Sequence, residues 1–393
     1  MRNMESFIAR HIAEVPPSGI RKFFDIASEM KDAISLGVGE PDFVTPWNIR
    51  ETAIFSIEHG STHYTSNWGT IELRREIAKY LSSRYGLGYN PKNEIAVTVG
   101  ASEALDLVFR AIINPGDEIL VPAPSYVSYM PGVRFAGGVP VCMETKEKDE
   151  FKLTEEIVRR SITSKTKAIV IPYPNNPTGA IMTKEELSAL REVIIKHDLL
   201  VISDEIYSEL TYGSGHASIA SFADIFPRCV VINGFSKAFA MTGFRLGYAA
   251  GPEPIISAMV KIHQYSMLAA STMSQAAGVE AIRHEMDTGF AQVEKMRKSY
   301  DQRRQYIFRS FNDIGLPCFE PKGAFYVFPN ITKSKMSSED FCNRLIHEKK
   351  VACVPGTAFG EAGEGFMRCS YAASIENIKE ALRRIAEFVN ENS

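Results

Sequence analysis

Lys237 is the residue of this chain whose position most suggests chemistry. It follows Ser236 in residues 233–247, which read NGFSKAFAMTGFRLG, and Arg245 lies near the end of the same stretch. The short apolar run at residues 229–232 is typical of a buried strand, so Ser236 and Lys237 fall in the turn after it. Two interpretations are open at this point. Either both cations are solvated loop residues, or Lys237 forms a Schiff base while Arg245 and Ser236 bind a phosphate.

Asp204 follows another apolar run, residues 199–203, and so lies at the edge of the predicted core. A carboxylate in that place needs a cation or hydrogen-bond donors. It is either a turn cap or the partner of a protonated pyridine nitrogen, as a pyridoxal cofactor requires. In the second case Tyr207 and Asn176 would donate to the ring oxygen, and Tyr126 would stack on the ring face.

A turn of small residues, Gly100, Ala101 and Ser102, precedes a stretch with helical spacing. Such a turn exposes backbone N–H groups and the positive end of the helix dipole, which suits a phosphate. A plain helix cap at Ser102 is the other interpretation. Near the N-terminus, Gly39 lies in a second glycine-rich turn, where it serves the turn or lets the backbone approach a ligand.

Alternating strands and helices are predicted from about residue 94 to residue 250. This pattern indicates βαβ units, a mostly parallel sheet and an α/β fold. Ligands bind such sheets beyond the carboxyl ends of the strands. Ser102, Asn176, Asp204 and Lys237 all follow predicted strands, so we expect them to converge at one edge of the sheet.

The two ends of the chain have different patterns. Residues 1–30 suggest an amphipathic arm and a first helix, and residues 271–311 suggest a long helical stretch that leads to a second domain. Short strands are expected at residues 324–328, 352–354 and 365–371, the last of which carries Arg368. Ser374 is expected to cap a terminal amphipathic helix.

Composition excludes several classes of function. The 393 residues carry a formal net charge of -3 with no long basic block, so neither nucleic acid nor an anionic membrane is an expected partner. No run is long and apolar enough for a membrane span, and no signal core is found, so we expect a cytoplasmic protein. The six cysteines form no C-x-x-C pair and the eight histidines lack ligand spacing, so no metal site is predicted.

Six fragments in order give the chain a resemblance to the class I/II pyridoxal-phosphate-dependent aminotransferases of fold type I. It extends from about residue 34 to the end. The fragments are LGVGEPDF at 36–43, HYTSNWG at 63–69 followed by ELR at 72–74, NNPTG at 175–179, DEIY at 204–207, FSKAFAMTGFRLG at 235–247 and RCSYA at 368–372. The resemblance implies a mostly parallel seven-stranded sheet flanked by helices, with a smaller α+β domain. It places a large cofactor-binding domain at residues 46–275, and a small domain at residues 1–45 and 276–393.

The resemblance also implies roles for individual residues around pyridoxal 5'-phosphate. Lys237 would carry the cofactor as a Schiff base and shuttle the substrate proton, with Asp204 and Tyr207 as its catalytic partners. Arg368 would bind the substrate carboxylate as a bidentate pair. The remaining cofactor contacts would come from Ala101, Ser102, Tyr126, Asn176, Ser236 and Arg245, and the remaining substrate contacts from Gly39, Trp68 and Asn176.

A homodimer with shared active sites is implied as well, because Tyr64 matches a tyrosine that reaches the phosphate of the neighbouring subunit. Many relatives have a hydroxyl residue where this chain has Gly234, so one phosphate contact is absent from the pattern. The expected reaction moves the amino group of an aspartate, aromatic or apolar L-amino acid to 2-oxoglutarate by a ping-pong mechanism. The alternative is a C–S β-lyase or another elimination enzyme on the same scaffold, which would use the same lysine and aspartate.

Overall fold

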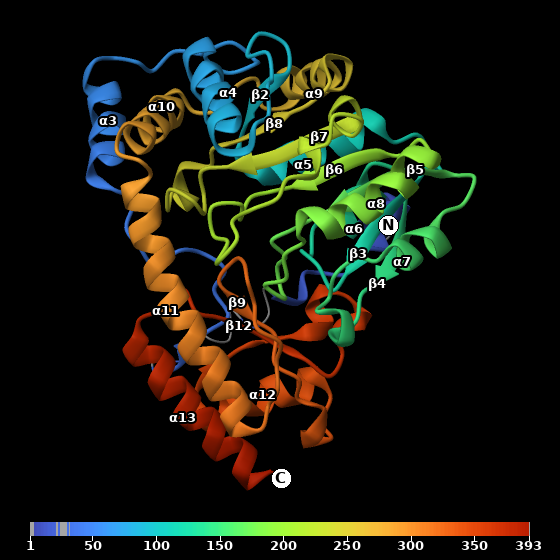
Figure 1. The fold of residues 1–393 in the computed structure, drawn as a ribbon, viewed down its shortest axis with the longest axis vertical. Helices are drawn as coiled ribbons and strands as arrows, with labels where there is room; N and C mark the ends of the chain where they lie inside the picture. Colours follow the sequence, from blue (N-terminus) through green and yellow to red (C-terminus); the bar gives the residue numbers. More distant parts are fainter. Residues whose placement is uncertain (1–3, 21–22, 24–29, 31, 393) are drawn as a thin grey trace.

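A computed structural model describes residues 4–20, 23, 30 and 32–392 of the chain. Its elements form two parts, a seven-stranded sheet with helices on both faces and a smaller part built around short strands and three long helices (Figure 1). The described part of the amphipathic arm, residues 4–20, contains a short helix, α1 (Arg10–Ala13). The helix expected toward residue 30 falls largely outside the described residues.

The large sheet has the strand order β2-β8-β7-β6-β5-β3-β4. β8 runs antiparallel to both of its neighbours, whereas the other neighbouring pairs are parallel, as the alternating pattern predicts. The strands are β2 (Ile95–Thr98), β3 (Glu118–Ala123), β4 (Val139–Glu144), β5 (Thr166–Ile171), β6 (Leu200–Asp204), β7 (Cys229–Gly234) and β8 (Gly247–Ala250).

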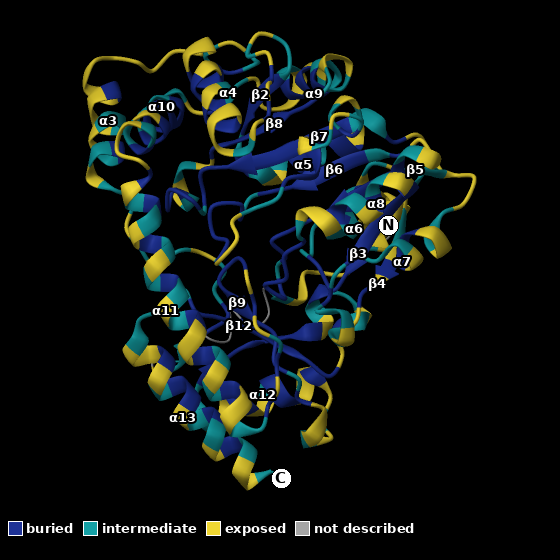
Figure 2. Ribbon diagram, viewed as in Figure 1, coloured by how far each residue is buried: buried dark blue, intermediate teal, exposed yellow. Residues whose placement is uncertain are grey.

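Side chains alternate between the two faces of this sheet. Val201 and Val231 pack into one apolar cluster with α4, α7, α8 and α10, and Ile202 and Val230 pack into a second with α5, α6 and α9. Both faces are therefore covered, which explains why the central strands β6 and β7 are buried along almost their whole length (Figure 2). The helices are α3 (Trp47–Glu58), α4 (Ile71–Tyr85), α5 (Gly100–Ile112), α6 (Tyr129–Phe135), α7 (Glu155–Ser161), α8 (Lys184–Lys196), α9 (Glu253–Ser266) and α10 (Thr272–Asp287).

The smaller part joins an N-terminal strand to the C-terminal third of the chain. β1 (Ile34–Ser35) pairs in parallel with β10 (Val351–Ala352), and β11 (Val354–Pro355), β12 (Met367–Ser370) and β9 (Tyr326–Val327) form an antiparallel sheet. The helices of this part are α11 (Ala291–Ile314), α12 (Ser338–Lys349) and α13 (Ile375–Glu391). Ser374 caps α13 by accepting a hydrogen bond from Asn377 N, as its position predicts. The division of domains at residues 46 and 275 stays a prediction.

Two local expectations differ from the structure. The helical stretch at residues 271–311 is broken at Gly289 and Phe290, which both have positive φ, so α10 and α11 are separate helices. Gly100 to Ser102 form the first turn of α5 and not a loop before it. The first difference splits one expected helical stretch into two helices, whereas the second moves a helix boundary by only a few residues.

Short 3₁₀ segments connect several of these elements. They are Met4–Phe7, Glu147–Asp149, Ile219–Ser221, Phe226–Arg228, Thr242–Phe244, Thr332–Ser334, Gly356–Phe359 and Glu361–Gly363. Across the part of the chain that the structure describes, every helix is too short or too polar to cross a membrane. The same residues contain no group of three or more His, Cys, Asp or Glu side chains placed to hold a metal ion.

Candidate active site

A cavity of about 1270 Å³ lies between the carboxyl ends of the parallel strands and the smaller part. Its walls come from the ends of β6 and β7, the start of α5, and the strands β9 and β12. The predicted site residues that line it are Gly39, Ala101, Ser102, Tyr126, Asn176, Asp204, Tyr207, Ser236, Lys237, Arg245 and Arg368. Residues from distant parts of the chain therefore face one another across a single space.

Lys237 extends into this cavity from the turn after β7. Its Nζ donates a hydrogen bond to Gly39 O at 2.6 Å, and it lies 5.8 Å from the centre of the Tyr207 ring. Burial lowers the pKa of Lys237 to about 8, because desolvation disfavours the ammonium form. A larger fraction of this amine than of an ordinary lysine is therefore neutral, and nucleophilic, near neutral pH.

Asp204 is the last residue of β6 and is 5% exposed. Its Oδ2 accepts a hydrogen bond from the Tyr129 hydroxyl at 2.7 Å, and its Oδ1 accepts one from Ile206 N at 3.2 Å. Among the described residues, Asp204 has no ion-pair partner within 4.0 Å. Burial raises the pKa of Asp204 to about 6, because an unpaired carboxylate is costly away from water. A cation bound in the cavity would relieve that cost.

The start of α5 and Arg245 form a second feature of the cavity, suited to an anion. Gly100 opens the helix with φ +77°, and a Cβ at this position would lie only 2.7 Å from an Arg245 guanidinium nitrogen. Arg245 NH1 donates to Thr242 O at 3.1 Å and its side chain is otherwise exposed. The free N–H groups of the first turn and the guanidinium together favour negative charge at this place.

Gly234 ends β7 opposite Gly247, where neighbouring backbone leaves little room for a side chain. A Cβ at Gly234 would lie 3.0 Å from Leu246 O and 3.1 Å from Gly247 Cα. Close packing of the two strands therefore accounts for the glycine at this position. A hydroxyl side chain here would require the strands to move apart.

Arg368 reaches the cavity from β12 and is almost fully buried. Its NH1 donates to Asn176 Oδ1 at 2.8 Å and its NH2 donates to Gly37 O. The guanidinium lies 4.5 Å from the Tyr326 ring centre, and its Nε has no hydrogen-bond partner. A buried guanidinium held by neutral acceptors lacks an anion, and a carboxylate supplies the bidentate partner that its geometry fits.

Two tyrosines of the cavity were missed by the sequence analysis. Tyr129 donates to Asp204, and the hydroxyl groups of Tyr326 and Tyr207 lie 2.8 Å apart. The signal for Tyr129 was its place three residues after Tyr126, because that spacing puts both rings on one side of a turn of chain. Tyr326 gave no local signal, since it belongs to a short apolar strand of the second part. Residues 15–20 of the N-terminal arm also line the cavity and were not anticipated.

Tyr64 and Trp68 do not line the cavity. The Tyr64 side chain is 86% exposed, and Trp68 is half-buried with the Arg74 guanidinium 5.9 Å from its ring centre. The Trp68 ring packs beside the apolar cluster of α5 and α9. Their predicted contacts with phosphate and substrate are not made within one chain, and they stay predictions.

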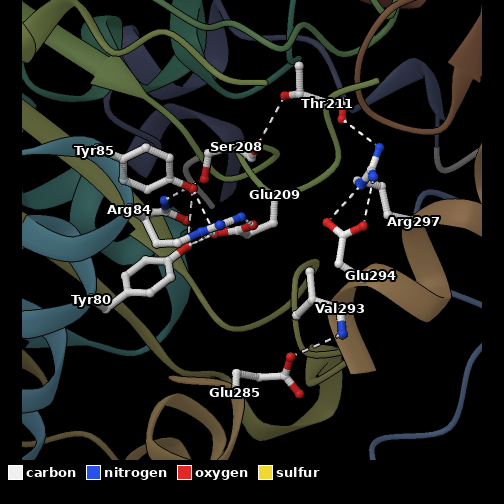
Figure 3. Close-up of polar contacts among 11 residues, drawn as sticks. Tyr80, Arg84, Tyr85, Ser208, Glu209, Thr211, Glu285, Val293, Glu294 and Arg297 are labelled. Atoms are coloured by element: carbon white, nitrogen blue, oxygen red, sulfur yellow. Dashed lines mark hydrogen bonds and ion pairs between the residues drawn. The ribbon is translucent and has the colours of Figure 1, made fainter. Parts of the chain in front are cut away.

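The segment that carries Asp204 and Tyr207 continues to Glu209, whose carboxylate is held by hydrogen bonds from α4 (Figure 3). Glu209 Oε1 accepts hydrogen bonds from the hydroxyls of Tyr80 and Tyr85, at 2.7 and 2.9 Å. Arg84 adds two more, from Nε at 3.0 Å and from NH2 at 2.5 Å. The Arg84 guanidinium also lies 4.2 Å from the ring centre of Phe290, at the junction of α10 and α11. This network joins α4 to the segment that reaches the cavity.

Comparisons with known proteins identify the family. Residues 31–385 match the family "Aminotransferase class I and II". The chain is 51% identical to the putative aminotransferase YugH of Bacillus subtilis, over 99% of this chain and 100% of that protein. It is 46% identical to an aspartate aminotransferase of Pyrococcus abyssi, over 96% and 97% of the two chains. The solved aromatic aminotransferase of Pyrococcus horikoshii has 44% identity and a TM-score of 0.89, over 94% of this chain and 99% of that chain. This chain therefore belongs to the class I and II aminotransferases, which are pyridoxal-phosphate-dependent enzymes of fold type I.

Proposed function

We propose that this aminotransferase moves the amino group of an L-amino acid of aspartate, aromatic or apolar type to 2-oxoglutarate. The donor would leave as a 2-oxo acid before 2-oxoglutarate binds, as in a ping-pong mechanism. The observation that carries the proposal is the meeting of Lys237, Asp204 and Arg368 in one cavity. Aspartate and aromatic donors are included because the relatives of this chain include aspartate and aromatic aminotransferases.

The described residues fit pyridoxal phosphate at both ends of the molecule. The carboxylate of Asp204 lacks a cation, which the protonated ring nitrogen supplies. The first turn of α5, with Arg245 and Ser236, suits the phosphate. When bound, the cofactor supplies an aldehyde that reacts with amines and a ring that withdraws electrons from the substrate α carbon.

Lys237 is the residue that we assign to covalent attachment and to proton transfer. Its Nζ would hold the cofactor and, once freed by the donor amine, would take the proton from the substrate Cα. The lowered pKa of about 8 supports this role, since a base must be partly neutral at the working pH. Tyr207 and Asn176 would orient the cofactor ring, and Tyr126 would stack on it.

Arg368 binds the substrate α-carboxylate in our assignment. Its free Nε and its contacts with neutral acceptors support this, because the guanidinium is buried without an anion. Gly39 closes the same region with its backbone, and a Cβ there would lie 2.7 Å from the Tyr326 hydroxyl. A bidentate clamp on the carboxylate would orient the α carbon so that its single C–H bond points toward Lys237.

We further infer a homodimer in which Tyr64 contributes to the neighbouring site. Large apolar side chains are exposed on α3 and on the loop after α9, including Trp47, Phe55 and Met267. Tyr64 lies in the loop before α4 and is also exposed, at 86%. Exposed apolar surface of this kind is typical of an interface between chains. The expected cytoplasmic location also stays a prediction.

The deciding experiment offers a panel of donors to the cofactor-loaded enzyme with 2-oxoglutarate. Aspartate, phenylalanine, tyrosine and leucine each test one side-chain type, and both products are measured. We expect glutamate and the matching 2-oxo acid in equal amounts. Pyruvate and ammonia from cystathionine, without glutamate from any donor, would instead identify a C–S β-lyase and contradict the proposal.

A further inference from the structure

Tyr129 is a buried tyrosine at the start of α6, and its hydroxyl contacts Asp204. Its side chain is almost fully buried, and its ring lies edge-on to Tyr126, with centroids 5.5 Å apart and an interplanar angle of 79°. The hydroxyl donates to Asp204 Oδ2 at 2.7 Å. Burial and the neighbouring carboxylate both raise the pKa of Tyr129, so the phenol keeps its proton and acts as the donor. The contact is therefore a charge-assisted hydrogen bond from a neutral phenol.

The two oxygens of Asp204 have different partners, and together these partners fix the plane of the carboxylate. Ile206 N holds Oδ1 at 3.2 Å from the backbone of the same segment, and Tyr129 holds Oδ2 from another element. The backbone donor is the longer and therefore the weaker of the two. Tyr129 is thus the main side-chain group that favours the ionised carboxylate in surroundings that otherwise disfavour it.

We propose that Tyr129 is a positioning residue for the cofactor ring nitrogen, since its hydroxyl keeps Asp204 an anion and holds it facing the ring. This inference rests on the proposed function, which places Asp204 against that nitrogen. Without the hydroxyl, Asp204 would keep one backbone donor in a buried place and would hold a proton of its own more often. A neutral carboxyl does not pair with a protonated ring nitrogen, so the cofactor would lose a specific part of its binding energy.

Another buried tyrosine of the chain serves as a matched control. Tyr89 is 5% exposed, does not line the cavity, and stacks on Phe226 with centroids 4.7 Å apart. Its hydroxyl has no hydrogen-bond partner among the described residues. Tyr89→Phe and Tyr129→Phe therefore remove the same atom from equally buried rings. Only the second removes a hydrogen bond to a carboxylate.

The experiment measures the dissociation constants of two cofactors for the full-length protein and both variants. One cofactor is pyridoxal phosphate, and the other is its analogue with carbon in place of the ring nitrogen. For Tyr129→Phe we expect pyridoxal phosphate to bind roughly 10- to 100-fold more weakly, the usual effect of a hydrogen bond to a charged group. The analogue should bind this variant within about threefold of wild type, because it offers Asp204 no cation. Tyr89→Phe should match wild type with both cofactors.

Each other outcome overturns a stated part of the inference. Equal weakening of both cofactors in Tyr129→Phe would mean that the ring only shapes the cavity. Unchanged binding of both would mean that Asp204 is held without the hydroxyl. If wild type binds the two cofactors equally well, the pairing of Asp204 with the ring nitrogen is itself wrong. That last result is read from the wild-type protein alone, so it is distinguishable from a failure of the role of Tyr129.

Discussion

Asp204 and Glu209 lie five residues apart on one segment, and both are buried carboxylates, yet their partners differ completely. Glu209 does not line the cavity, and it accepts hydrogen bonds from Arg84, Tyr80 and Tyr85 (Figure 3). Asp204 faces the cavity and has a phenol and one backbone N–H. One carboxylate is neutralised within the chain, and the other is left for a cation that the chain does not supply.

The difference shows how a fold keeps a reactive residue in place. An uncompensated buried charge destabilises the segment that carries it, because its surroundings favour movement toward water or proton uptake. The network around Glu209 ties the same segment to α4, and through Arg84 to the junction of α10 and α11. The anchor at Glu209 therefore permits an unpaired carboxylate at the cavity.

The largest expected effect is that of Lys237→Ala, on the cavity side. Removal of the amine takes away both the attachment point and the base, so turnover should fall to the background rate while the fold is retained. Amino-transfer assays measure the turnover, the cofactor absorbance reports the loss of attachment, and circular dichroism tests whether the fold is retained. Full activity in the variant would refute the assignment of Lys237.

Asp204→Asn should lower kcat/KM by roughly 100- to 1000-fold, the usual range for loss of one member of a buried charge pair. The amide can still accept from Tyr129, so the local packing is kept. The apoprotein should be no less stable than wild type, because the variant lacks the unpaired charge. Steady-state kinetics and urea unfolding of the apoprotein measure the two effects. If Asp204→Asn were less stable than wild type and kept its kinetics, Asp204 would be a structural carboxylate, which is the role assigned here to Glu209.

Glu209→Ala should show the opposite pattern. It leaves the hydroxyls of Tyr80 and Tyr85 without their acceptor and removes the ion pair with Arg84, which is an exposed residue, so the free energy of unfolding should fall by about 1–3 kcal/mol. The activity of each folded molecule should stay within about threefold of wild type, since Glu209 touches neither the cavity nor a proposed ligand. Activity loss in the folded fraction would show that the anchor also sets the catalytic geometry.

The stability of the apoprotein should depend on pH through Asp204. An aspartate normally titrates near 3.8, and burial raises the pKa of Asp204 to about 6. Between these values the folded protein holds a proton that the unfolded chain has released, so stability falls as pH rises from about 4 to 6 and then levels off. The loss should be about 2–3 kcal/mol at most. Urea titrations of wild type and Asp204→Asn across this range measure it, and identical pH profiles for the two proteins would contradict the expectation.

Much of the architecture is readable from the sequence because its signals are local. Apolar runs of strand length alternate with helical spacing from residue 94 to residue 250, and this alternation implies a mostly parallel sheet. Ser102, Asn176, Asp204 and Lys237 each follow such a run, and parallel strands bring their carboxyl ends to one edge. Their meeting in one cavity follows from those two facts.

Only the tertiary structure determined which of these residues have hydrogen-bond or ion-pair partners within the chain and which lack them. Tyr129 and Asp204 are 75 positions apart, and Tyr207 and Tyr326 are 119 apart, so no local pattern links them. The helical periodicity also did not predict the break at Gly289 and Phe290, because the break depends on where α11 turns toward the smaller part. The sequence by itself determined the family, the sheet and the residue types at the strand ends. Burial and partners, which set the charge states of Lys237 and Asp204, exist only once distant segments pack together and exclude water.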